Sequence, residues 1–107
     1  MEPHRIVAVM SASRGVVCGV WAKVCRSRGA AIKEAREIDA LPLIRKFGKN
    51  GNAKTHYLVT FQIEDVSGAI VDRIDKYGCM SCIGGREEDN NLSLVYKELK
   101  ARGFSRV

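Results

Sequence analysis

The sequence predicts a single α+β domain, in which an antiparallel sheet carries two helices on one face. An apolar run at residues 6–10 and an alternating segment at residues 57–63 each lead, through small polar residues, into an apolar helical pattern. The two helical patterns stop at Gly29 and Gly78. Two units of strand, turn, helix and glycine in a chain of 107 residues favour a single domain, residues 1–107, that is built on one split β-α-β sheet.

The segment at residues 57–63 carries the clearest strand signal. Its larger apolar side chains alternate along the chain and therefore share one face of a sheet. These side chains are Tyr57, Val59, Phe61 and Ile63. Residues 6–10 form a continuous apolar run, which is typical of a central strand.

The first helix is expected to begin after Ser11 or Ser13, because either side chain can cap it. Its apolar stripe follows the spacing i, i+3, i+4 and i+7. The stripe comprises Val17, Val20, Trp21 and Val24. Residues 31–41 have a helix-forming composition but lie where the second strand is needed, so a helix and a strand both remain open there.

Two further helices are expected in the second half of the chain. One follows Asp65 or Ser67 and ends before Gly78. The other covers residues 92–102, and Gly103 provides its stop.

The remaining signals complete the predicted order. Asn50-Gly51 indicates a hairpin that joins a strand at residues 43–47 to the strand from residue 57. Residues 79–83 are expected to form the fourth strand. The resulting arrangement is ferredoxin-like, with the order βαββαβ and an additional C-terminal helix.

Positive charge is concentrated in the first half of the chain, and the net charge is +6. Up to His56 there are eleven lysines and arginines against four acidic residues, and from Tyr57 onward there are seven against eight. This asymmetry favours a polyanion or an anionic ligand as partner, with a merely solvated surface as the alternative. Since no apolar run approaches the ~20 residues of a membrane span and no signal-peptide pattern is found, we expect a cytosolic protein without a membrane partner.

Few residues suggest catalysis or metal binding. Cys79 and Cys82 form a C-x-x-C motif, which can bind a metal or act in redox chemistry, with two buried small side chains as the alternative. In a strand their odd spacing directs the side chains to opposite faces, which disfavours joint ligation. His4 and His56 precede the two clearest strands and would meet at one sheet edge if those strands are neighbours. We expect no enzymatic activity, no metal and no cofactor, because no nucleophile and base assemble.

Residues 57–84 resemble the opening of an ACT domain, in which a strand, an acidic turn with glycine, a helix, a glycine and a second strand follow one another. The turn glycine is Gly68, and residues 6–38 repeat the pattern with Gly15. The resemblance implies a regulatory module that binds amino acids or similar small molecules at a paired interface. It places Gly68 and Gly15 beside the ligand and is compatible with a homodimer.

Residues 54–61 are similar to the third strand of the RNA-recognition motif, with Lys54, Val59 and Phe61 in register. This second resemblance implies a sheet that binds RNA.

The leading expectation is non-enzymatic binding of nucleic acid, RNA rather than DNA. Cations around the predicted hairpin would contact phosphates. They are Arg36, Arg45, Lys46, Lys49 and Lys54. Tyr57 or Phe61 would stack on bases if their face of the sheet is open. An ACT-like small-molecule module is the alternative function, and a subunit of a larger assembly is the third.

Overall fold

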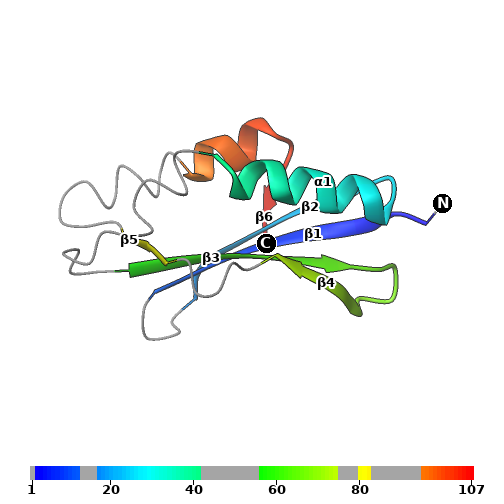
Figure 1. Cartoon of the computed structure of the whole chain (residues 1–107), viewed down its shortest axis with the longest axis horizontal. Helices are drawn as coiled ribbons and strands as arrows, with labels where there is room; N and C mark the ends of the chain where they lie inside the picture. Colours follow the sequence, from blue (N-terminus) through cyan, green and yellow to red (C-terminus); the bar gives the residue numbers. More distant parts are fainter. Residues whose placement is uncertain (1, 13–16, 42–55, 75–79, 83–94) are drawn as a thin grey trace.

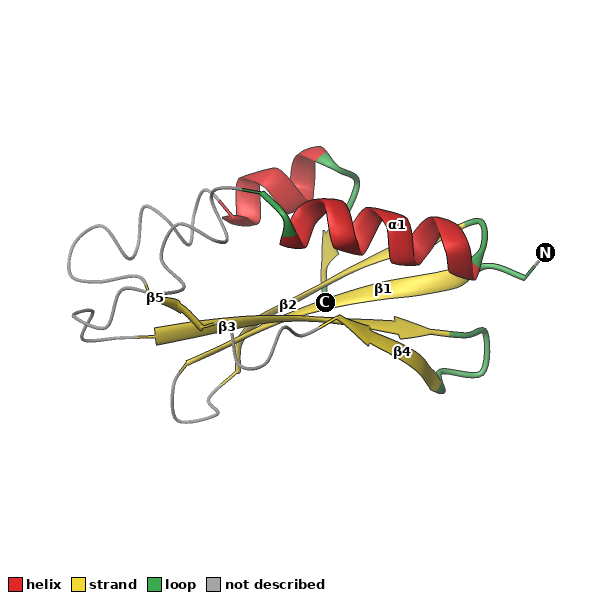
Figure 2. Cartoon of the chain, viewed as in Figure 1, coloured by secondary structure: helices red, strands yellow, loops and turns green. Residues whose placement is uncertain are grey.

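A computed structural model describes residues 2–12, 17–41, 56–74, 80–82 and 95–107. In this part of the chain six strands form one antiparallel sheet, and helices cover one of its faces (Figures 1 and 2). The elements are β1 (His4–Ala12), β2 (Val17–Cys25), α1 (Arg28–Asp39), β3 (His56–Glu64), β4 (Ile70–Ile74), β5 (Met80–Cys82), a helix at residues 95–101, and β6 (Ser105–Arg106). The strand order is β4-β3-β1-β2-β6, and β5 pairs with the first residues of β3. The α+β class predicted from the sequence is correct.

The helix predicted after Ser11 or Ser13 is wrong, because residues 17–25 form β2. This strand pairs with β1 along its length, from His4 opposite Cys25 to Met10 opposite Gly19. The spacing of apolar residues misled the prediction, because β2 carries apolar side chains on both faces and so loses the period of two. Its β-branched valines also favour a strand.

The helix predicted after Asp65 or Ser67 is also wrong, because residues 70–74 form β4, which pairs with β3. The hydrogen bonds expected of a capping Asp65 side chain are nevertheless present. The Asp65 carboxylate accepts hydrogen bonds from the backbone N–H groups of Ser67 at 2.9 Å and Ala69 at 3.1 Å. Such local bonds stabilise a turn as readily as a helix start. Here they close the β3–β4 turn, in which Gly68 has φ +88°.

Residues 31–41 lie largely in α1, so the helix is the correct alternative there. The Ser27 hydroxyl caps α1 by accepting a hydrogen bond from the Ala30 N–H at 3.2 Å. Gly29, predicted to end a helix, instead lies in the first turn of α1.

The predicted βαββαβ order is not observed, because the described elements run β1, β2, α1, β3, β4 and β5, and the consecutive strands β1 and β2 pair antiparallel. The predicted strand at residues 79–83 coincides with β5. The predicted strand at residues 43–47 and the Asn50-Gly51 hairpin lie outside the described residues.

The hydrophobic core lies between the sheet and the helices. Alternate residues of β1 and β3 supply its floor, while α1 and the helix at residues 95–101 supply its cover. The fully buried side chains include Ile6, Ala8, Met10, Phe61, Ile63, Ala31, Ala35, Ile38 and Leu99. The predicted inward face of residues 57–63 is confirmed for the side chains that the structure describes, Val59, Phe61 and Ile63.

Gly103, the predicted helix stop, has φ +93° and completes a Schellman motif. The Phe104 N–H donates to the carbonyl of Leu99, and the Gly103 N–H donates to that of Lys100. Phe104 then packs into the core beside Leu99, and β6 follows along the edge of β2. Among the described helices, none is long and apolar enough to cross a membrane.

Candidate functional site

The structure describes only part of the predicted nucleic-acid site. Arg36 is exposed in the last turn of α1. Four of the predicted hairpin cations lie outside the described residues, as does Gly15; these cations are Arg45, Lys46, Lys49 and Lys54. The backbone of Tyr57 lies in β3, paired with Ala12 on one side and Ser81 on the other.

Phe61 does not lie on an open face, so the condition for its predicted stacking on bases is not met. Its side chain is completely buried in the core. The reason is topological, because α1 and the helix at residues 95–101 cover the face of β3 that carries the alternating apolar residues (Figure 2).

The helices present a group of exposed cations on the side that faces away from the sheet. Lys33 and Arg36 are three residues apart on α1, and Lys97 and Lys100 are three apart on the second helix, so each pair lies close together on its helix. All four side chains are exposed, because the apolar stripes that contain Ala31, Ala35, Val95 and Leu99 turn toward the core. We call these four residues the helix-layer cations.

Carboxylates near the helix-layer cations are paired with other cations. Glu34 accepts a hydrogen bond from Lys23 Nζ at 2.7 Å. Arg102 contacts Glu98 at 2.9 Å and reaches Glu37 on α1 at 3.7 Å, so it links the two helices. Among the described residues, no ion pair involves any of the four helix-layer cations. Their charge therefore faces solvent without a carboxylate of the described residues within 4 Å, and the nearest exposed acid along α1 is Glu37, four residues after Lys33.

Only Arg36 among the helix-layer cations was predicted from the sequence. Lys97 and Lys100 were detectable, since they lie on the far side of the predicted helix from Val95 and Leu99. Lys33 was missed because the sequence hypothesis selected cations around the predicted hairpin, and Lys33 lies further from that hairpin along the chain than Arg36.

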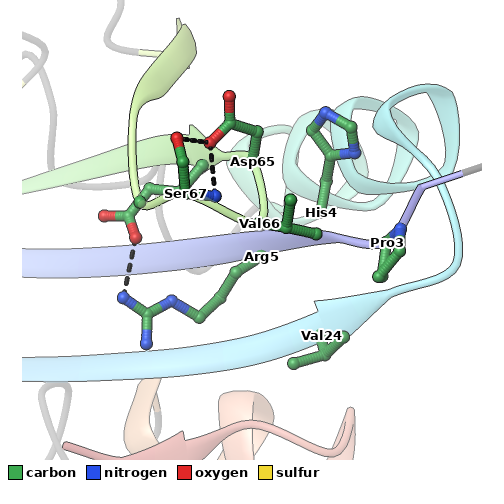
Figure 3. A pocket seen from close by; sticks show the side chains of 9 residues that line it. Pro3, His4, Arg5, Val24, Asp65, Val66 and Ser67 are labelled. Carbon is green, nitrogen blue, oxygen red and sulfur yellow. Dashed lines mark hydrogen bonds and ion pairs between the residues drawn. The ribbon is translucent and has the colours of Figure 1, made fainter.

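A second candidate site is a pocket of about 430 Å³ at one end of the sheet, which we call the sheet-end pocket (Figure 3). It lies where the start of β1, the end of β2 and the β3–β4 turn meet. Its polar lining comprises His4, Arg5, Glu64, Asp65 and Ser67, and Gly68 lines it as well. The Arg5 guanidinium contacts the Glu64 carboxylate at 2.7 Å.

The electrostatics of the sheet-end pocket are dominated by the Asp65 turn. The hydrogen bond from the Ser67 hydroxyl, at 2.6 Å, lowers the pKa of Asp65, and the backbone N–H groups of Ser67 and Ala69 and the nearby His4 act in the same direction. Asp65 is therefore charged at neutral pH, and one of its carboxylate oxygens already accepts the hydrogen bonds of the turn. Gly68, predicted beside a ligand, does line this pocket.

The two histidines do not meet. Because β1 and β3 are antiparallel, His4 lies near Glu64 at one end of the sheet, whereas His56 lies at the other end, opposite Cys82. The sequence expectation required the two strands to be neighbours, which they are, but their antiparallel direction places the two strand starts at opposite ends of the sheet.

The cysteines give no metal site in the part of the chain that the structure describes, where no group of three or more potential ligands gathers. Cys25 is buried, and burial followed by the neighbouring Glu34 raises the pKa of its thiol. Cys79 lies outside the described residues, so the C-x-x-C motif stays untested.

In comparisons with known proteins, no family model, no curated protein and no solved structure matches this chain.

Proposed function

We propose that this chain is a non-enzymatic nucleic-acid-binding protein whose helix layer contacts the phosphate backbone, with RNA as the preferred partner. The observation that carries the proposal is the exposure of Lys33, Arg36, Lys97 and Lys100 while nearby carboxylates are paired elsewhere. Lysine and arginine side chains that face solvent in this way neutralise phosphates and release counterions. The predicted hairpin cations Lys46 and Lys49 would extend the same contact.

The described aromatic rings support phosphate contacts rather than base stacking. Trp21, Phe61 and Phe104 are buried. Tyr96 packs against Trp21, with ring centroids 5.4 Å apart, and Arg106 lies over its ring. Because these rings are engaged within the fold, binding through the helix layer would depend on charge and be tolerant of sequence.

The test is binding of a short fluorescent single-stranded RNA, measured by anisotropy over a range of salt concentrations. Four phosphate contacts predict a loss of about 50-fold in affinity between about 50 and 200 mM salt. Arg36→Glu and Lys97→Glu, on the two helices, should each weaken binding and reduce the salt slope by about 0.7. Reversal of Lys46 and Lys49 together tests the hairpin in the same assay, and DNA of the same sequence tests the preference for RNA.

The matched control is Arg73→Glu, because Arg73 is an exposed arginine on β4, opposite Gln62 rather than in the helix layer. It makes the same change in net charge at another place. Equal weakening by Arg36→Glu and Arg73→Glu would refute a localised surface, and binding that is absent or insensitive to salt would remove the proposal.

A second candidate function is small-molecule binding in the sheet-end pocket. It is favoured by one observation, that Gly68, the glycine implied by the ACT-domain resemblance, lines a pocket with both acidic and basic groups. A panel of amino acids should then raise the melting temperature. Val66→Trp should abolish that rise, because Val66 lines the pocket and is exposed, so a larger side chain fills the space without disturbing the core.

A further inference from the structure

We propose that two copies of this chain associate face to face through the side of the sheet opposite the helices, which we call the open sheet face. Its residues alternate with the core residues along β1, β2 and β3. Those with described side chains are Arg5, Val7, Val9, Val20, Ala22, Val24, Thr60, Gln62 and Glu64. Both described helices lie on the other side of the sheet (Figure 2).

The open sheet face is apolar on β1 and β2 and polar on β3. Five of its six described residues on β1 and β2 are apolar, whereas an antiparallel sheet that faces water normally carries polar side chains on that side. On β3 the described residues of this face are Thr60, Gln62 and Glu64. Val24 is 67% exposed, and Ile70 of β4 is 47% exposed. Val7, in the middle of this face, is already buried at 7% exposure. Burial of Val24 and Ile70 against a partner would therefore supply most of the apolar surface released from water.

The partner is identified by a row of four side chains that runs across the open sheet face. Pairing places Val24 beside Arg5, Arg5 beside Glu64, and Glu64 beside Ile70. The row therefore reads apolar, basic, acidic, apolar. When an identical row is turned by a two-fold axis parallel to the strands, Arg5 faces Glu64 of the second copy and Val24 faces its Ile70. The row is complementary to itself, as an isologous dimer requires.

Such a dimer has consequences for both candidate sites. The sheets would lie about 10 Å apart, with the helices on the two outer sides, so both sets of helix-layer cations would stay accessible. The sheet-end pocket would be partly closed by the partner, since Arg5, Glu64 and Val24 also line it.

The size of the face predicts the strength of the association. Three strands of nine residues make a face of about 14 by 30 Å from standard strand spacing and rise. This is smaller than the roughly 800 Å² per partner of a standard stable interface. We therefore expect a dimer that dissociates on dilution.

The test is the mass of the purified full chain, measured by sedimentation from low to high micromolar concentration. The expected result is a shift from 11.8 kDa toward twice that mass as concentration rises. Val24→Glu should stay monomeric throughout, because it places a charge opposite Ile70 of the partner. Arg5→Glu should also stay monomeric, since Glu64 of the partner then faces a like charge, and the double variant Arg5→Glu, Glu64→Arg should recover the dimer.

The control is Ala101→Glu, which adds the same charge at an exposed apolar residue of the helix layer and should dimerise like the wild type. Circular dichroism checks that each variant is folded, and Val24, being mostly exposed, tolerates substitution. A wild-type chain that is monomeric at every concentration would overturn the proposal. A dimer that persists in Val24→Glu would overturn it equally, because association would then use another surface.

Discussion

Substitution of Phe61 distinguishes a core ring from a base-stacking ring, two roles that the sequence alone allowed. The Phe61 side chain is completely buried and belongs to the same core cluster as Ile6 and Met10. Leucine keeps most of the apolar surface, so Phe61→Leu should cost about 1 kcal/mol, mainly from lost packing. A loss of about 1 kcal/mol lowers the melting temperature of a domain of this size by about 4–8 °C. Phe61→Ala should cost about 3–5 kcal/mol, because it leaves a larger cavity.

Two measurements on Phe61→Leu distinguish a core ring from a base-stacking ring. Thermal unfolding should show the loss of stability, while RNA affinity well below the melting temperature should stay within about twofold of the wild type, since the ring does not reach solvent. A stacked ring would give the reverse result, with a loss of about 1–3 kcal/mol of binding per base and little change in stability. Reduced RNA affinity with unchanged unfolding would therefore refute the buried position of Phe61.

The remaining predictions concern two glycines and the Asp65 turn. Gly103→Ala should lower stability by about 1–2 kcal/mol in denaturant unfolding, because an L-residue is strained at φ +93°. Gly29→Ala should instead stabilise by about 0.4–1 kcal/mol, since a Cβ there meets nothing within 4 Å and lies in a helix; equal effects of the two would contradict the assigned backbone. The pKa of Asp65 is lowered by folding, so its contribution to stability is present above its unfolded pKa and is lost as the pH falls through the folded value. Asp65→Asn should accordingly lose less stability than the wild type on acidification below about pH 4, as measured by unfolding at a series of pH values.

Local chemistry in the sequence was sufficient for several parts of the fold. The alternation of Val59, Phe61 and Ile63 predicted which face of β3 is buried. Asp65 and Gly103 were recognised as sites where the chain stops or turns, because side-chain acceptors and positive φ act over a few residues. The excess of lysine and arginine was also apparent from the sequence. It motivates the proposed function but does not indicate which surface binds.

The position of the candidate sites depended on contacts between distant residues. The helix-layer cations and the sheet-end pocket exist as groups only because α1, the second helix and the strand ends converge, with Arg102 linking Glu37 to Glu98. No local pattern reports that convergence. The burial of Phe61 likewise depends on which face the helices cover.

The sequence by itself determined the α+β class, the buried face of β3 and the turns at Asp65 and Gly103, because each follows from interactions within a few residues. Only the tertiary structure decided that residues 17–25 and 70–74 are strands. Their apolar spacing suits a helix and a strand alike, and the choice is made by backbone hydrogen bonds to β1 and β3, which belong to the pairing and not to either segment.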